Sequence, residues 1–373
     1  MLEDGPKKIA YAFVVYGAAS SGVFKKICDQ VAFWRSSGYS VQLFIITDKN
    51  SVKYWREIDQ SAEILIDSGS LSKAINRWKL IKLALKSNPQ LLYLRDSFPI
   101  RIPKTDLPII IEVQTLVGRE LKLRSIIRYH FFSIYKKRYY KKIDGVVYVT
   151  NELMQINEFK IKDHVPRISI SNGINLQEFQ TLPKQQNQVP ALFFMGHPNQ
   201  PWHGVSELVE FARVNQNIEV HIVGESVQIS LPNLYSYGRV TRKDIFSIAS
   251  KCTAGVGSLN LSKIELNEAS PLKVREYLAL GLPVILRYQD PDLKSTDGFV
   301  LQLPSDERNL LHFSIEIQKF LESWKGKRVS HELITSLDVS IKEKARLKYF
   351  QEVLSKIPSG ASPEPWVHGD ANK

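Results

Sequence analysis

The sequence has very few cysteines and no apolar run long enough to cross a bilayer. Cys28 and Cys252 are the only two cysteines among 373 residues, which excludes a secreted disulfide scaffold and is typical of a reducing compartment. The best candidate for a membrane segment, residues 9–19, is shorter than the roughly 18 apolar residues of a span. Residues 1–8 lack the apolar core of a secretory signal. We therefore expect a cytoplasmic protein that does not span a membrane.

The chain also lacks solenoid-type repeats, and its composition is that of a globular protein. Hydrophobic residues make up 43% and charged residues 24%, which excludes a wholly disordered, collagen-like or coiled-coil chain. A length of 373 residues, at roughly 100–200 residues per domain, predicts two or three domains.

Positive charge is concentrated in the first half of the chain. Residues 1–183 carry 28 Lys and Arg against 17 Asp and Glu, whereas residues 184–373 carry 22 against 21. Within the first half, Arg119 to Lys142 contains nine basic residues and one acid, Glu120. Such a cluster attracts anionic partners, whether phospholipid, nucleic acid or phosphorylated substrate. Aromatic and aliphatic residues interleave these charges, so the segment is either a solvated helix face or a surface that rests on an anionic membrane.

Short apolar runs alternate with amphipathic stretches along the whole chain, which predicts βα units around parallel sheets. The expected strands are residues 8–16, 41–46, 91–94, 108–112, 146–149, 168–171, 191–195, 219–223, 254–257 and 284–286. The expected helices are residues 23–37 and 121–142, helices that begin at Val205, Arg242 and Pro271, and residues 341–355.

Residues 182–190 are polar and bracketed by prolines, which is linker composition. The fold class is therefore α/β, with two doubly wound Rossmann-like domains that face each other across a cleft. We expect residues 1–183 to form an N-terminal Rossmann-like domain and residues 184–340 a C-terminal one. Residues 341–357 would form a helix that packs back on the N-terminal domain, and residues 358–373 a flexible tail.

The segment from Glu268 to Ile285 contains the most informative residues. Ser270 suits the N-cap of a helix and Pro271 its first turn. The backbone amides of Ser270, Leu272 and Lys273 would then form an anion site, strengthened by the helix dipole and the Lys273 ammonium group.

Two acids flank this expected anion site. Glu276 is three residues after Lys273, so both side chains can face the same way, and a carboxylate there can accept hydrogen bonds from a sugar diol. Glu268 precedes the helix and can reach another part of the ligand. An anion site between two groups that bind hydroxyls fits a nucleoside diphosphate sugar.

The Glu-x7-Glu pair around Ser-Pro-Leu-Lys, ahead of Gly-Leu-Pro-Val-Ile, resembles the donor-binding segment of family-four retaining glycosyltransferases, which have the GT-B architecture of two Rossmann-like domains. Further segments resemble that family in the expected order: Ser171-Asn-Gly-Ile-Asn175, Phe194-Met-Gly-His197, Trp202-His-Gly-Val205, Ile222-Val-Gly224 and Tyr237-Gly-Arg-Val240.

The resemblance implies that residues 1–183 form the acceptor domain and residues 184–340 the donor nucleotide-sugar domain. It also implies roles for particular residues. The catalytic candidates are Glu268, Lys273 and Gln114. The donor-binding candidates are Glu276, Ser270, Pro271, Leu272, His203, Arg242, Gly196 and Gly224. The loop that approaches the diphosphate or the acceptor contains Gly17, Ser21 and Gly22.

The sequence departs from the family pattern at three positions. His197 and His203 stand where relatives carry Arg and Lys, and Gln114 stands where they place a His. Glutamine binds a sugar hydroxyl but does not shuttle a proton at neutral pH. Each candidate also has a simpler structural explanation: solvated glutamates, a packed Trp202–His203 pair, a surface Arg242 and a turn at Asn172–Gly173.

The resemblance implies retention of configuration and a hydroxyl acceptor in a bacterial cell-surface polysaccharide or glycolipid. The basic segment from Arg119 to Lys142 is consistent with peripheral attachment to the inner face of the membrane. We expect no cofactor and no metal. This expectation rests on identifying no Asp-x-Asp motif for a metal-held diphosphate, which fits a site where backbone amides and cations hold the leaving group. One alternative is a nucleotide-sugar-binding protein without transfer activity. The other is a nucleic-acid binder. Only the high pI supports this alternative, and the sequence contains no recognisable RNA- or DNA-binding motif, so we expect no nucleic-acid partner.

Overall fold

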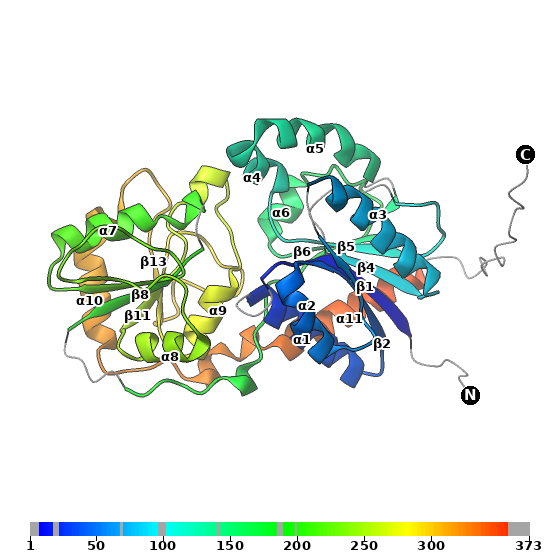
Figure 1. The fold of residues 1–373 in the computed structure, drawn as a ribbon. Coiled ribbons are helices and arrows are strands. Elements are labelled where there is room, and N and C mark those ends of the chain that lie inside the picture. The colour runs from blue at the N-terminus through cyan, green and yellow to red at the C-terminus, as the bar shows by residue number, and fades with distance from the viewer. Residues whose placement is uncertain are drawn as a thin grey trace, which may run out of the picture.

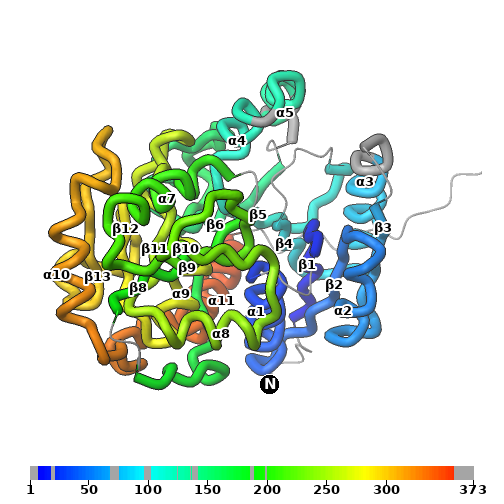
Figure 2. Tube along the Cα trace, turned by 60° about the vertical axis from the view of Figure 1, so that its left-hand side comes forward, coloured from blue at the N-terminus to red at the C-terminus, as the bar shows by residue number. Residues whose placement is uncertain are grey.

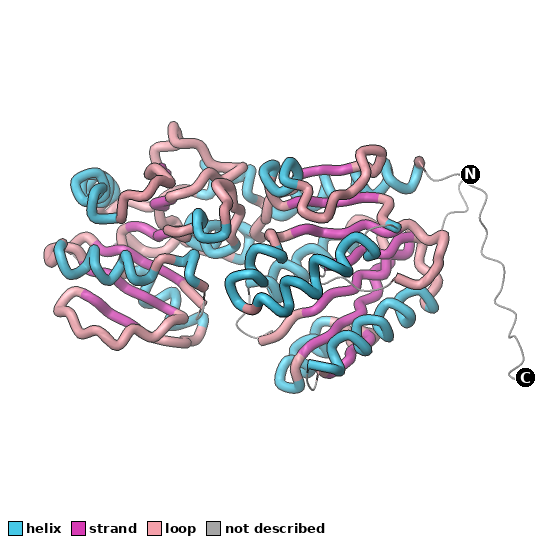
Figure 3. Tube along the Cα trace, turned by 90° about the horizontal axis from the view of Figure 1, so that it is seen from above, coloured by secondary structure: helices cyan, strands magenta, loops and turns pink. Residues whose placement is uncertain are grey.

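The structure is a computed structural model that describes residues 7–17, 22–67, 70–95, 102–139, 142–184, 189–197 and 200–356. These residues form two parallel β-sheets that lie side by side, each between layers of helices (Figures 1 and 3). The α/β class with two doubly wound domains is therefore confirmed.

The first sheet has the strand order β3-β2-β1-β4-β5-β6-β7, and its strands are all parallel. Its strands are β1 Lys8–Val14, β2 Ser40–Thr47, β3 Glu63–Ile66, β4 Leu91–Arg95, β5 Ile109–Val113, β6 Gly145–Tyr148 and β7 Arg167–Ser169. In β1, Tyr11 and Phe13 are buried on one face and Ala10 and Ala12 on the other. Burial on both faces explains why this strand is an unbroken apolar run.

Helices cover both faces of the first sheet. The buried residues of α1 Gly22–Ser36, α2 Val52–Ile58 and α11 Val339–Ser355 pack on the face that contains Tyr11. Those of α3 Ser70–Lys86, α4 Val117–Arg124, α5 Ile126–Tyr139 and α6 Asn151–Ile156 pack on the face that contains Ala10.

The C-terminal helix α11 belongs to the first sheet although it follows the second in the chain. Figure 1 shows α11, in orange-red, among the blue and cyan elements of the N-terminal domain. The Trp34 indole N–H donates to Glu343 at 2.8 Å, and the Trp34 and Phe350 rings lie 5.4 Å apart. These contacts place α11 against α1.

The second sheet has the order β10-β9-β8-β11-β12-β13, again with parallel strands. Its strands are β8 Ala191–Met195, β9 Glu219–Val223, β10 Leu234–Ser236, β11 Ala254–Val256, β12 Val284–Leu286 and β13 Val300–Gln302. Its helices are α7 Val205–Val214, α8 Arg242–Ser250, α9 Leu272–Ala279 and α10 Ser314–Trp324. Residues of α7 and α10 are buried on one face, and residues of α8 and α9 on the other.

The expected single helix over residues 121–142 is wrong, because α4 ends at Arg124 and α5 begins at Ile126. Ser125 between them has extended backbone angles (φ −164°, ψ 108°). Its amide donates to the Leu121 carbonyl at 2.7 Å, and its hydroxyl lies 3.5 Å from the Arg128 amide. Serine competes for backbone hydrogen bonds in this way, which favours helix ends over helix interiors.

Among the described residues, no helix combines the length and the apolar character that a membrane crossing requires.

Candidate functional site

Both sheets reverse their strand order at one point. The first reverses between β1 and β4, and the second between β8 and β11. Ligands of doubly wound sheets bind outside the carboxyl ends of the strands at such a switch point. The loops that leave β1 and β8, with Gly17 and Gly196, therefore mark the candidate region. The contact of the two domains lies here too, because a Cβ on Gly22 would be 3.5 Å from Glu276 Oε1.

The start of α9 differs in detail from the sequence prediction. Pro271 is the N-cap and no side chain caps the helix, so the expected Ser270 cap is wrong. The Ser270 hydroxyl instead accepts from the Asn172 amide at 2.8 Å, which ties the helix start to the end of the N-terminal domain. Leu272 and Lys273 are the first two helical residues, whose N–H groups have no acceptor within the helix.

The ammonium group of Lys273 is buried without a hydrogen-bond partner among the described residues. Its Nζ is 4.1 Å from the centre of the Phe194 ring. Burial lowers the pKa of Lys273 to about 7, and only the Glu225 carboxylate works against that shift. The Glu225 charge offsets only part of the cost of burying this cation, and an anionic ligand at this helix start would offset more of it.

His203 packs on the same Phe194 ring, with the ring centres 5.7 Å apart. Its Nδ1 accepts from the His197 amide at 3.3 Å, so the neutral ring carries its proton on Nε2. Burial, together with the charges of Lys273 and His197, lowers the pKa of His203 to about 2. His203 is therefore a neutral hydrogen-bond donor beside Lys273.

Glu276 lies one turn into α9, at the contact between the two domains. Burial raises its pKa to about 7, against the charges of Arg242 and Lys25. Arg242, the first residue of α8, lies over the rings of Phe179 and Phe246 at 5.2 and 5.6 Å. Glu276 and Arg242 are thus close enough to interact. Both are predicted donor-binding residues, and their proximity is consistent with contact to the same ligand.

The Glu268 side chain contacts the first turn of α6 and is not simply solvated. Its Oε2 accepts from the backbone N–H of Glu152 at 2.7 Å, and the Glu152 carboxylate accepts from the N–H groups of Glu268 and Asn267 at 2.7 and 2.9 Å. This pair, which we call the Glu152–Glu268 clasp, joins the two domains. One carboxylate oxygen of Glu268 is committed to it.

The glycines after β8, β9 and β10 join three strand ends. The Gly196 amide donates to Val223 at 2.8 Å, and the Gly224 amide to Gly238 at 2.6 Å. A Cβ on Gly224 would lie 2.2 Å from the Gly196 carbonyl oxygen, and its φ of +87° favours glycine. Close packing of backbone on backbone accounts for Gly196 and Gly224 at these positions.

The remaining candidates lie at strand ends of the first sheet. Gln114 follows β5, and its side-chain nitrogen is buried without a hydrogen-bond partner among the described residues. Gly17 follows β1, and its amide donates to Asp48 at 2.8 Å. Ser21 lies outside the described residues.

Sequence reasoning missed a buried charge network below this edge of the first sheet. Glu112, in β5, is fully buried and lies 2.8 Å from Lys26, 3.4 Å from Arg346 and 3.5 Å from Arg95. Burial alone would raise the pKa of Glu112, but the three cations hold it down at about 2. The sequence did contain a signal for this network, because an acid within the otherwise apolar strand Ile-Ile-Ile-Glu-Val indicates a buried, paired carboxylate.

The expectation that the chain has no Asp-x-Asp motif is wrong, because Asp290-Pro-Asp292 is one. Such pairs can bind a metal-held diphosphate, but here both acids contact Arg275, Asp290 at 2.8 Å and Asp292 at 2.6 Å, and Lys342 contacts Asp292 at 2.5 Å. In the part of the chain that the structure describes, no three His, Cys, Asp or Glu side chains gather closely enough to hold a metal ion.

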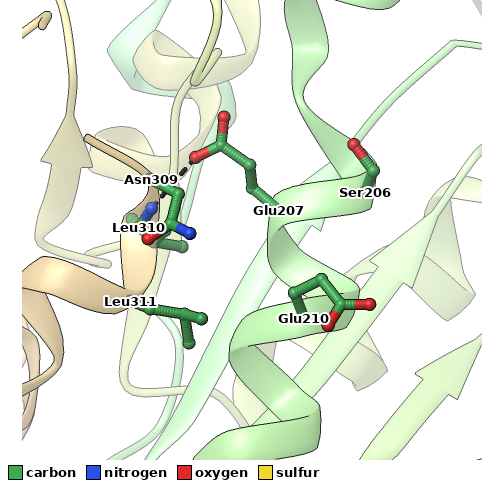
Figure 4. Close-up of a pocket in the computed structure, with 6 residues that line it drawn as sticks. All are labelled: Ser206, Glu207, Glu210, Asn309, Leu310 and Leu311. Atoms are coloured by element: carbon green, nitrogen blue, oxygen red, sulfur yellow. Dashed lines mark hydrogen bonds between the residues drawn. The ribbon is translucent and has the colours of Figure 1, made fainter. Parts of the chain in front are cut away.

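A small cavity of about 120 Å³ lies away from these residues, between α7 and the turn that precedes α10 (Figure 4). Its lining residues are Ser206, Glu207, Glu210, Asn309, Leu310 and Leu311. Glu207 accepts from the Leu310 amide and from Arg287, both at 3.0 Å. None of the predicted site residues lines this cavity.

No known family model matches the sequence, and no curated protein sequence matches it. Solved structures do match the fold. Sucrose-phosphate synthase from Thermosynechococcus elongatus superimposes with a TM-score of 0.66 at 12% identity, over 93% of this chain and 99% of that one. The lipopolysaccharide outer core galactosyltransferase WaaB, in its apo form, gives 0.60 at 11% identity over 92% and 99%. Anabaena HepE in complex with UDP and glucose gives 0.60 at 12% identity over 91% and 99%.

These proteins are glycosyltransferases of the GT-B type, and their similarity extends over both sheets of this chain. Counted within each domain, the strands of both sheets follow the order 3-2-1-4-5-6, with one further strand in the first. The chain therefore has the GT-B fold that the sequence resemblance predicts.

Proposed function

We propose that the protein is a retaining, metal-independent glycosyltransferase that moves a sugar from a nucleoside diphosphate sugar to a hydroxyl acceptor. One observation supports this proposal above all. Lys273 belongs to the first turn of α9, where the Leu272 and Lys273 amides have no acceptor within the helix. Its buried ammonium group has no hydrogen-bond partner among the described residues and lies near the neutral donor His203. A diphosphate supplies the negative charge and the acceptor oxygens that this arrangement lacks.

The same groups would act in the reaction. As the bond from the sugar to the diphosphate breaks, negative charge grows on the leaving phosphate. Lys273, the Leu272 amide and His203 would stabilise that charge more strongly in the transition state than in the bound donor. Lys273, with a pKa of about 7 in the empty site, would be held in its charged form by the phosphate.

The flanking acids would bind the two organic ends of the donor. Glu276, at the domain contact, would accept hydrogen bonds from the ribose diol, and the free carboxylate oxygen of Glu268 would accept one from the transferred sugar. Retention rests on the resemblance of the Glu268–Ile285 segment to family-four enzymes. Attack from the face of the leaving group is consistent with it, and the departing phosphate would then take the acceptor proton.

The acceptor that we propose is a glycan or glycolipid of a bacterial cell surface. One structural neighbour is described as a lipopolysaccharide outer core galactosyltransferase, which supports this class of acceptor. The cytosolic location expected from the sequence stays a prediction.

Binding of nucleoside diphosphate sugars to the variant Lys273→Met tests the proposal. With UDP-, GDP-, ADP- and dTDP-sugars at about 100 times Kd, one base class should raise the melting temperature of the wild type by about 5 °C. Lys273→Met should lose that shift. Lys263→Met, which removes an exposed lysine of the same domain, should keep it. A shift of equal size in Lys273→Met, or no shift with any donor in the wild type, would contradict the proposal.

A second candidate function is nucleotide-sugar binding without transfer. Gln114 favours it, because this side chain does not shuttle a proton and its amide nitrogen is buried without a partner. Donor hydrolysis and transfer to a panel of glycan acceptors separate the two functions. Binding without turnover on any acceptor supports the second, whereas turnover that Glu268→Ala abolishes supports the first.

A further inference from the structure

Helix α5 has apolar residues on its outer side as well as on its inner side. Ile127, Phe131 and Ile134 are 79%, 48% and 65% exposed. They are spaced by four and three residues, so at about 100° per residue they form one stripe along the helix. Leu123 and Ile126, 51% and 53% exposed, lie just before it in the chain. We call Ile127, Phe131 and Ile134 the α5 apolar face.

The inner side of α5 already fixes the helix to its domain. Phe132 is fully buried and lies 5.9 Å from Phe159. It is one residue from Phe131 and two from Ile134, and so points away from the exposed stripe. Packing within the N-terminal domain therefore accounts for Phe132 but leaves Ile127, Phe131 and Ile134 facing solvent, and a contiguous exposed apolar patch marks an interaction surface.

Charge decides which partner fits this surface. Lys122 and Arg128 are exposed beside the α5 apolar face, and residues 119–142 carry nine basic residues against the single acid Glu120. Two copies of the chain joined through this face would bring two positive clusters together, which is unfavourable. A nucleic acid would satisfy the charges but would leave the aliphatic side chains without an apolar partner. An anionic lipid surface satisfies both.

The surface projects from the molecule near the contact of the two domains. Figure 2 shows α5 standing above the remaining elements, and Figure 1 shows α4 and α5 together at the top of the N-terminal domain. Arg119 of α4 contacts the Glu265 carboxylate of the C-terminal domain at 3.1 Å. A bilayer that touches the α5 apolar face would therefore lie beside the edge where the two domains meet.

We propose that the α5 apolar face docks the protein on an anionic lipid bilayer. Ile127, Phe131 and Ile134 enter the boundary between headgroups and acyl chains, while Lys122 and Arg128 contact the anionic headgroups. This docking requires neither donor nor acceptor, so it is independent of the proposed glycosyl transfer.

Flotation of the full chain with vesicles tests the docking. Vesicles of phosphatidylcholine with about 30 mol% phosphatidylglycerol should bind the wild type, and pure phosphatidylcholine vesicles should bind it at least about tenfold more weakly. The triple variant Ile127→Ser, Phe131→Ser, Ile134→Ser should lose at least about tenfold in partition coefficient. Its matched control is Ile315→Ser, which changes a residue of α10 that is 66% exposed and should bind as the wild type does.

The charge contribution has its own pair of variants. Lys122→Glu with Arg128→Glu should weaken binding at least about tenfold at physiological salt. Lys319→Glu with Lys344→Glu, two exposed lysines of α10 and α11, changes the net charge equally and should have little effect. Melting curves verify that every variant is folded, and a donor-induced thermal shift reports separately on the proposed function.

Three results would overturn the docking proposal. The first is equal vesicle binding by the triple serine variant and the wild type. The second is binding to RNA at physiological salt with no binding to anionic vesicles. The third is concentration-dependent self-association that the triple serine variant loses, again with no vesicle binding.

Discussion

Glu152 and Glu268 each donate a backbone N–H to the carboxylate of the other, both at 2.7 Å, across the boundary between the two domains. This reciprocal clasp gives Glu268 a structural role beside the catalytic role that we propose for it. The two roles make different demands on the side chain, because the clasp needs one acceptor oxygen and the proposed sugar contact needs the second carboxylate oxygen.

Two substitutions separate these roles. Glu268→Gln keeps an acceptor oxygen, so the free energy of unfolding should fall by less than about 1 kcal/mol while transfer falls at least about 100-fold. Glu152→Ala leaves the amides of Asn267 and Glu268 without their acceptor and should cost about 1–3 kcal/mol, with transfer reduced by about tenfold or less. Urea unfolding and steady-state kinetics measure both effects. Equal losses of transfer in the two variants would restrict Glu268 to the clasp.

Donor binding should take up a proton at alkaline pH. Lys273 has a pKa of about 7 in the empty site, so above pH 7 most molecules must protonate it before it can pair with a phosphate. The Kd of the donor should then rise by up to about tenfold per pH unit. Calorimetry at pH 8 in buffers of different ionisation enthalpy should show uptake approaching one proton.

A pair of variants assigns that proton. Lys273→Met should abolish proton uptake, whereas Glu276→Gln removes the other group with a pKa of about 7 and should retain it. His203 stays neutral in both, because its pKa is about 2. Uptake that persists in Lys273→Met would place the proton on another group and would contradict the assignment.

Removal of Glu112 should strongly destabilise the N-terminal domain. Glu112→Ala leaves Lys26, Arg95 and Arg346 without their shared counter-ion and should lower the free energy of unfolding by about 3–5 kcal/mol. Glu178→Ala is the exposed control, because Glu178 pairs with Lys25 at 44% exposure and should cost about 0–1 kcal/mol. Urea unfolding at pH 7 gives both values, and similar values for the two variants would be inconsistent with the network.

The acid sensitivity of the wild type has the same origin. The pKa of Glu112 is about 2 in the folded chain, below its ordinary value of 4.5. The stability that it contributes is therefore complete above about pH 4.5 and is lost as the pH falls towards 2. Glu112→Ala should show a smaller loss of stability over this range.

The stability costs of three Gly→Ala substitutions should show whether a glycine is required by close packing or by its backbone conformation. Gly224→Ala places a Cβ 2.2 Å from the Gly196 oxygen at a φ of +87°, and should cost more than the roughly 1–2 kcal/mol of a left-handed residue alone. Gly17→Ala has a φ of +66° but nothing within 4 Å, so it should cost about 1–2 kcal/mol. Gly298→Ala has neither feature and should be near neutral. The decrease in melting temperature should be largest for Gly224→Ala, smaller for Gly17→Ala and smallest for Gly298→Ala.

The sequence predicted the elements whose patterns are local. β8 and β9 match their expected bounds, Ala191–Met195 and Glu219–Val223, because each is a short run rich in aromatic or β-branched residues that is followed by glycine. β3, Glu63–Ile66, was not identified, because it is a short edge strand whose residues are only partly buried or exposed. Strand order also could not be predicted, because it depends on pairings between distant segments.

The candidate site shows the same division. The start of α9 was located from residues that are neighbours in sequence, and Lys273 and Glu276 lie where the helix period places them. Their surroundings come from elsewhere in the chain. Lys273 interacts with Phe194 and Glu225, which both lie far before it in the sequence. Glu268 contacts Glu152, from which 116 positions separate it. No local pattern specifies such contacts, so neither the low pKa of Lys273 nor the clasp was predicted.

The position of α11 has a consequence for how the protein is made. Leu347, Phe350 and Val353 complete the core that surrounds Tyr11 and Trp34, yet the ribosome adds them after nearly all other described residues. Domains generally fold as units during synthesis, the N-terminal one first. Here the N-terminal domain cannot complete this core until the C-terminal domain has been synthesised, so its final packing is a late step of folding.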